Sequence, residues 1–249
     1  MTLWRLEWLR LVRSRRLVAL VGVYLFFGLL GPITARYLSE ILERLGEDVV
    51  VQFPDPVPAD GIAQFTANAN QIGLLVAVVV AAGALVIDAI PEMSIFLRTR
   101  VAEVGRLLAP RLLVSLIAVA AAFLIGLLGA WYETAVLLGG LPVGAMAAGA
   151  LMTILYLAFV VALTAAVGSR LGSVLGTVAT TVVVLLVLPI VGLADVVGRW
   201  LPSHLLGALD ALIRDAEPLS EYLPAATVTA AGSAALVWLA ARWASRTEL

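Results

Sequence analysis

The sequence predicts an all-α membrane protein with six transmembrane helices, an N-terminal interfacial helix and both termini on the cytoplasmic side. The chain is 62% hydrophobic and only 13% charged, with a mean hydropathy of +1.06. Soluble domains carry about a quarter charged residues. Six stretches also reach the roughly 20 apolar residues that a spanning helix needs. We therefore expect a single transmembrane domain over residues 1–249, with no room for a sizeable soluble domain.

Residues 1–16 predict a helix that lies in the membrane interface, with Trp4, Arg5 and Trp8 as its interface residues. Apolar side chains recur on one helical face and most of the arginines fall elsewhere. Tryptophan suits the headgroup zone, and arginine suits anionic lipid phosphate. A frayed basic terminus is the alternative. The apolar run that follows is long enough to span, and no small-x-small cleavage site follows it, so we expect a retained span and not a signal peptide.

The spans are predicted from apolar runs of sufficient length. They cover residues 17–35, 72–90, 112–132, 143–168, 171–194 and 223–241. Only Ser169 and Arg170 separate the fourth and fifth runs, which could in principle be one broken helix. Together they are far too long for one crossing, so we expect two helices joined by a tight turn.

The arginines set the orientation, because cytoplasmic loops carry an excess of positive residues. With the N-terminus inside, twelve of the sixteen basic residues are cytoplasmic, and all sixteen are arginine. Arg36, Arg44, Arg199 and Arg214 are the four outside. This distribution predicts a multi-pass protein of the cell membrane with cytoplasmic termini.

The two long outer loops, 36–71 and 195–222, each predict a short helix on the outer membrane surface. The first helix begins near Arg36 with Gly46 as its C-cap, and the proline-rich run 53–60 after it should be extended. The second helix should be N-capped by Ser203 and ended by Pro218.

The residues needed for catalysis or metal binding are sparse, so we predict no catalytic, cofactor or metal site. The chain has no lysine and hence no GxxxxGK[ST] phosphate loop. It has no cysteine and one histidine, His204, which is too few for a metal site. Asp88 is the only acid in a predicted span, and we interpret it as an interfacial ion-pair partner of Arg98 or Arg111. A formal charge of −1 argues against nucleic-acid binding.

Small residues mark possible close helix contacts. Gly172 and Gly176 have the spacing that lets helix backbones approach, as do Gly140 and Gly144. The first pair predicts either intramolecular packing or a dimer seam. Pro189 is expected to kink the fifth span.

The stretch from Pro91 to Arg111, between the second and third spans, carries the strongest functional signal. It holds Arg98, Arg100, Arg106 and Arg111 among regularly spaced apolar residues. A plain connector needs only a few polar residues, so the pattern favours amphipathic helices that dock a soluble partner. An interfacial turn that only satisfies the positive-inside bias is the alternative.

This layout resembles the type-2 family of ABC exporter permeases, which have an interface helix, six spans and a coupling loop between helices two and three. Glu92 is similar to the family's loop glutamate, and the run Ile95 to Val101 to its apolar stretch and break. Arg106 and Arg111 stand near its basic positions. The chain departs from the family at Val101, where proline is common, and lacks the Gly-Thr pair after the glutamate.

The resemblance implies a permease subunit that moves a hydrophobic or amphipathic substrate outward. Two permeases, identical or homologous, would each receive a separate ABC ATPase, and ATP-Mg would bind only to that ATPase. The implied coupling residues lie in the 91–106 loop: Glu92, Phe96, Arg98, Arg100, Glu103 and Arg106. An ATPase-independent secondary transporter, a membrane enzyme and a non-transporting anchor subunit are the alternatives. Threonines are the only notable polar groups within the spans, which is little support for a secondary transporter.

Overall fold

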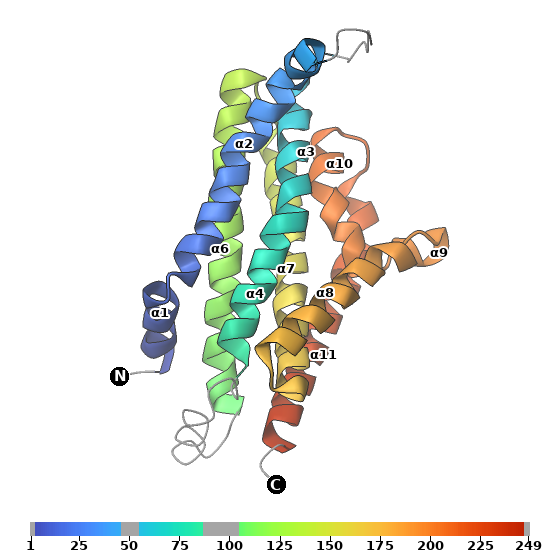
Figure 1. The fold of residues 1–249 in the computed structure, drawn as a ribbon. Coiled ribbons are helices and arrows are strands. Elements are labelled where there is room, and N and C mark those ends of the chain that lie inside the picture. The colour runs from blue at the N-terminus through green and yellow to red at the C-terminus, as the bar shows by residue number, and fades with distance from the viewer. Residues whose placement is uncertain (1–2, 46–54, 87–104, 247–249) are drawn as a thin grey trace.

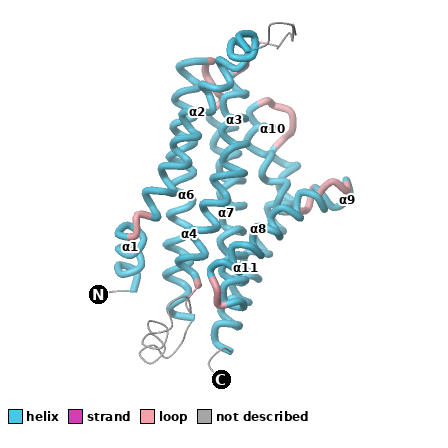
Figure 2. The backbone as a smooth tube through the Cα atoms, viewed as in Figure 1, coloured by secondary structure: helices cyan, strands magenta, loops and turns pink. Residues whose placement is uncertain are grey.

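The computed structural model describes residues 3–45, 55–86 and 105–246, and within these ranges the regular structure is all helical (Figure 2). Six helical segments are long and apolar enough to cross a membrane. They cover Arg16–Leu38, Pro58–Leu85, Leu108–Leu137, Val143–Leu171, Val174–Val191 and Leu219–Ser245. The predicted all-α membrane architecture with six spans is therefore confirmed.

The described helices are drawn in chain order in Figure 1. Their bounds are α1 Leu3–Arg13, α2 Arg16–Leu45, α3 Pro58–Asn68, a π-helical turn η1 Ala69–Gly73, α4 Leu74–Leu85, α6 Gly105–Leu137, α7 Val143–Leu171 and α8 Val174–Val191. After them come α9 Asp195–Gly198, the 3₁₀ turn η3 Pro202–Gly207, α10 Ala208–Ile213, the 3₁₀ turn η4 Leu219–Tyr222 and α11 Leu223–Arg246.

Two helix boundaries differ from the sequence prediction at the end of the bundle opposite α1. Helix α2 continues unbroken to Leu45, so Arg36 does not begin a separate surface helix. The second span begins at Pro58, well before residue 72. Proline is tolerated in the first helical turn, where its missing N–H would have no partner. The Asp60 carboxylate also accepts a hydrogen bond from the Val57 N–H at 2.8 Å, which closes the start of α3.

Helix α7 lies at the centre of the bundle. It contacts α4, α6, α8, α10 and α11, and 72% of its most apolar window is buried, against 17% for α8 and α11. On one side of it, α2 and α6 approach so closely that a Cβ on Gly126 would lie 2.5 Å from the Tyr24 carbonyl oxygen. The Phe123 ring packs beside them against Tyr24 and Phe65. Small residues let these backbones approach closely. Such packing is common in membranes, where no hydrophobic driving force brings helices together.

Helix α8 leans away from the bundle, and the chain then turns back through η3 and α10 onto α7 (Figure 1). Leu205 and Leu209 are fully buried there, and a Cβ on Gly149 would lie 2.6 Å from the Leu209 Cα. The expected amphipathic helix of this loop therefore exists, but its apolar face packs against protein and not on the membrane surface. Its start also differs, since the N-cap is Leu201 and not Ser203.

Candidate functional site

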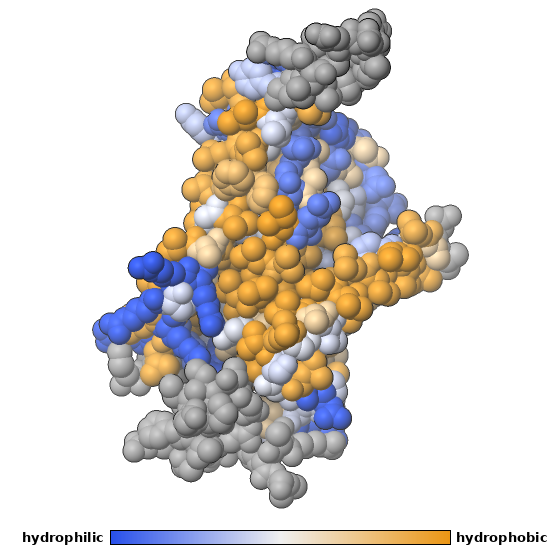
Figure 3. Space-filling view, in the orientation of Figure 1, coloured by the Kyte–Doolittle hydropathy of each residue, from blue (hydrophilic) through white to orange (hydrophobic). Residues whose placement is uncertain are grey.

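One end of the bundle collects most of the arginines, and we call it the arginine-rich end. Helix α1, the end of α4, the start of α6, the α7–α8 turn and the end of α11 lie there (Figure 1). A hydrophilic patch covers α1 in the space-filling view, next to a broad apolar band across the middle of the molecule (Figure 3). Chain segment 87–104 connects α4 to α6 at this same end. Helix α1 contacts both α2 and α6, so it lies beside the place where that connection enters α6.

A buried ion pair holds α1 against α6. The Arg111 Nε donates to the Glu7 Oε1 at 3.0 Å. Arg111 is only 4% exposed and Glu7 only 8%. Arg10 adds a weaker contact from the same helix, with its Nη1 3.9 Å from the Glu7 Oε2. Because a buried charge is costly unless it is paired, each of these groups requires the other in this position.

The remaining contacts of α1 fix its direction relative to α2. Leu11 is 5% exposed and belongs to the core cluster that includes α2, α4 and α6. Arg15, between the two helices, has a φ of 58°, which turns the chain sharply before Arg16. The Arg16 guanidinium then lies over α4, because a Cβ on Gly83 would be 2.8 Å from its Nη1. The absence of a side chain at Gly83 leaves this space to the guanidinium.

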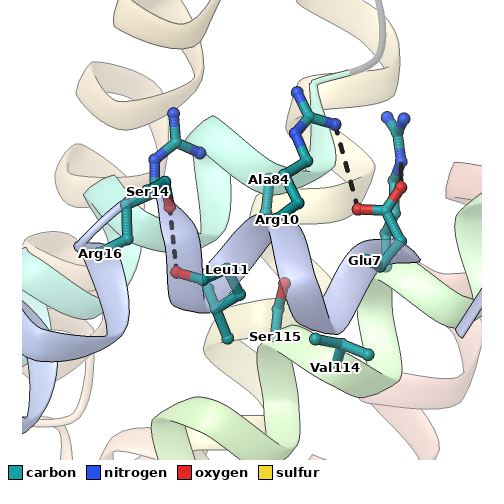
Figure 4. Close-up of a pocket in the computed structure, with 9 residues that line it drawn as sticks. Glu7, Arg10, Leu11, Ser14, Arg16, Ala84, Val114 and Ser115 are labelled. Carbon is teal, nitrogen blue, oxygen red and sulfur yellow. Dashed lines mark hydrogen bonds and ion pairs between the residues drawn. The ribbon is translucent and has the colours of Figure 1, made fainter. Parts of the chain in front are cut away.

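A shallow hollow, partly open to solvent, lies between α1, α4 and α6, and we call it the junction pocket. Its lining residues come from four helices. They are Glu7, Arg10, Leu11, Ser14, Arg16, Ala84, Arg111, Val114 and Ser115 (Figure 4). The arginines and Ser115 give it donors, and Glu7 is the one acid among these residues.

The structure places only some of the residues predicted from the sequence. Of the coupling residues, Arg106 lies in the first turn of α6, and its side chain is outside the described part. The others, Glu92, Phe96, Arg98, Arg100 and Glu103, lie outside the described residues, as does Asp88. The described partner of Arg111 is Glu7, which the sequence interpretation did not propose.

The residues predicted for the interface helix lie on a helix, and its position in the membrane interface stays a prediction. Residues 3–13 form α1, and Trp4 and Trp8 are 47% and 43% exposed. Arg5 is exposed as well. The side that faces the protein carries Glu7 and Leu11, so these residues connect α1 to the bundle.

The glycine pair of the fifth span has another role within this chain. Gly172 is the C-cap of α7 with a φ of 65°, a conformation that favours glycine. Gly176 lies in the first turn of α8, where the Ser173 hydroxyl accepts its N–H at 3.0 Å. A Cβ on Gly172 would meet nothing within 4 Å, and one on Gly176 only Ser173 and Leu171. No intramolecular seam forms here among the described residues, and the dimer seam stays a prediction.

The opposite end of the bundle has polar contacts that tie α3 to the loop after α8. Arg214 bonds Asp60 at 2.7 Å and Asp210 at 2.9 Å. The hydrogen bond with Asp60 is the main reason that the pKa of Arg214 is raised above its ordinary value. His204 stacks on the Tyr222 ring at 4.7 Å between centroids. In the part of the chain that the structure describes, no group of three or more His, Asp or Glu residues is placed to hold a metal ion.

Comparisons with known proteins do not assign the chain to a family. A scan against models of protein families, a search of curated proteins and a search of solved structures each found no match.

Proposed function

We propose that this chain is the transmembrane permease subunit of an ABC exporter, which works with a separate ATPase subunit. One observation carries the proposal. The α1 helix is fastened by a buried ion pair to the first turns of α6, at the arginine-rich end of a bundle with six candidate spans. A helix held in this way moves with α6. A soluble partner that pushes on the connection would therefore act on α1, α4 and α6 together.

The arginine-rich end is the cytoplasmic end in this proposal, and the membrane is the cell membrane. Both follow from the excess of arginine at cytoplasmic loops. The partner ATPase would dock at residues 91–106, where Glu92, Phe96 and Arg98 offer acidic, apolar and basic groups within seven residues of sequence. Nucleotide binding and hydrolysis belong to that partner, because this chain lacks lysine and therefore the phosphate-loop motif.

A second copy or a homologue would complete the transport path. Helix α8 fits this role, since it leans out of the bundle and exposes large apolar side chains such as Leu175 and Leu186, which are 82% and 64% exposed. The cargo is a hydrophobic or amphipathic molecule, because the spans carry few polar groups. Export of a charged sugar polymer by reconstituted vesicles, without export of amphiphiles, would contradict this choice of cargo.

The test is a pull-down of the tagged chain from native membranes, with mass spectrometry and an ATP hydrolysis assay. The test variant carries Arg98→Glu and Arg106→Glu. The matched control carries Arg36→Glu and Arg199→Glu, which make the same charge change at two positions predicted to lie on the outer side. We expect a separate ABC ATPase to co-purify with the wild type and the control, and to be lost from the test variant.

Two results would count against the proposal. If the chain is recovered without an ATPase, a secondary transporter or an anchor subunit becomes the better interpretation. If the ATPase is retained equally by the test variant, the complex does not depend on the 91–106 loop.

A further inference from the structure

The junction pocket carries an excess of positive charge. Three arginines and one glutamate line it, and Arg111 already forms a hydrogen-bonded pair with that glutamate. Arg10 reaches the same carboxylate only at 3.9 Å, the outer limit of an ion pair. The lining residues thus hold two more positive than negative charges. A concave site with such an excess favours an anion.

The donors that line the pocket suit a tetrahedral anion bound at its open side. Figure 4 shows the guanidinium groups of Arg10 and Arg16 projecting to the same side of α1, with Ser14 between them along the chain. Ser115, which is 2% exposed, adds a hydroxyl from α6 to the lining. Guanidinium groups present paired N–H donors that match the geometry of phosphate oxygens. We propose that the junction pocket binds a phosphate group through Arg10 and Arg16.

The depth of the pocket indicates where such a group would come from. Arg16 is the first residue of the first span and Ala84 is one residue before the end of the second. Arg111 and Ser115 lie in the first turns of the third span. The pocket is therefore level with the ends of three spans, where phospholipid headgroups lie. A lipid phosphate is the nearer source, and free phosphate shares the same chemistry. The inference does not rest on the proposed export function, since it requires only the pocket and a membrane.

The experiment uses the full chain in detergent and counts bound lipid by native mass spectrometry. Phosphatidylglycerol, phosphatidylcholine and inorganic phosphate are titrated separately. The pocket variant carries Arg10→Gln and Arg16→Gln, and both single variants are made in case the double variant folds poorly. The control carries Arg5→Gln and Arg13→Gln, which remove the same charge from α1 at exposed positions outside the pocket lining.

We expect the wild type and the control to bind phosphatidylglycerol alike, and the pocket variant to bind it roughly tenfold or more weakly, as the loss of a charge-assisted hydrogen bond implies. Each single variant should show part of that loss. If inorganic phosphate binds to the wild type instead and is lost only in the pocket variant, the site holds a free phosphate. An equal loss in the pocket and control variants would overturn the proposal, because it would reveal only general charge attraction. The proposal would also be overturned if the wild type bound neither phosphatidylglycerol nor inorganic phosphate.

Discussion

Removing the charge of Glu7 should release α1 from the bundle. Glu7→Gln keeps the size of the side chain but leaves the 4%-exposed Arg111 without its described carboxylate partner. Breaking a buried ion pair by removing one partner costs about 3–5 kcal/mol. The α1 helix has one other strongly buried apolar anchor among its described side chains, Leu11, whose burial contributes about 1.5–3 kcal/mol. The lost interaction is therefore at least as large as the anchor that remains.

A cysteine at Ser115 reports this release, because the chain has no native cysteine and Ser115 is 2% exposed beside α1. Its labelling rate by a water-soluble maleimide follows the fraction of molecules in which α1 has left. A loss of about 3 kcal/mol shifts that equilibrium by roughly 100-fold. We expect the Ser115→Cys protein to be labelled about 100-fold faster when Glu7→Gln is added.

Two comparisons decide whether the ion pair is responsible. Glu40→Gln removes the same charge at an exposed position of α2 and should leave the labelling rate unchanged. The exchange of Glu7→Arg with Arg111→Glu should restore at least part of the protection, because opposite charges again face each other. Unchanged labelling in Glu7→Gln, or an equal rise in Glu40→Gln, would refute the reasoning that the pair holds α1 in place.

Three further predictions concern other joints of the fold. Arg15 has a φ of 58°, which β-branched residues rarely adopt, so Arg15→Val should weaken α1 docking, whereas Arg15→Gly should not, as the same labelling assay would show. In Gly126→Ala the new Cβ would lie 2.5 Å from the Tyr24 carbonyl oxygen, so the melting temperature in detergent should fall by several degrees for an overpacking cost of about 1–3 kcal/mol. Arg214→Gln removes ion pairs whose side chains are 35% or more exposed, so thermal unfolding should change by no more than about 1 kcal/mol; a large drop would show that the pair with Asp60 is a structural lock.

The existence of the six spans was predictable, because length and hydropathy determine whether a segment can cross a membrane. Their boundaries were harder to predict at the end opposite α1. The helix that begins at Pro58 starts inside the proline-rich run 53–60, so the expected extended chain is wrong from Pro58 onward, and the first-turn position makes this proline acceptable. Helix α2 extends beyond the apolar span predicted to end at residue 35, because nothing in the sequence from Arg36 to Leu45 breaks a helix.

The packing partner of α10 could not be predicted from the sequence, for a different reason. Its apolar face was visible in the spacing of Leu205, Leu209 and Ile213, but an apolar face can be covered by lipid or by protein equally well. The deciding feature is Gly149 on α7, which leaves room for the Leu209 backbone to approach. A single glycine in a chain with 21 glycines gives no local sign of that role.

The sequence contained an indication that Glu7 has a specific role, but the prediction from the amphipathic pattern of α1 did not use it. It is the only acid in the first 39 residues, and five arginines lie within the same first 16. An acid among so many bases on an interfacial helix either weakens the attraction to anionic lipid or serves a specific partner. Its burial against Arg111 favours the second explanation.

The need for a charged anchor follows from the environment of α1. Lipid tails are as apolar as leucine, so helices in a membrane are held together by close packing and hydrogen bonds and not by a hydrophobic driving force. An amphipathic helix at the interface is free to rotate and slide unless a directional contact stops it. The hydrogen bond from Arg111 to Glu7 supplies that direction. It leaves Trp4 and Trp8 exposed and holds Arg10 at the pocket that Arg16 also lines. A contact that fixes the rotation of α1 therefore also assembles the charges of the junction pocket, so loss of the ion pair and loss of the phosphate site should occur together.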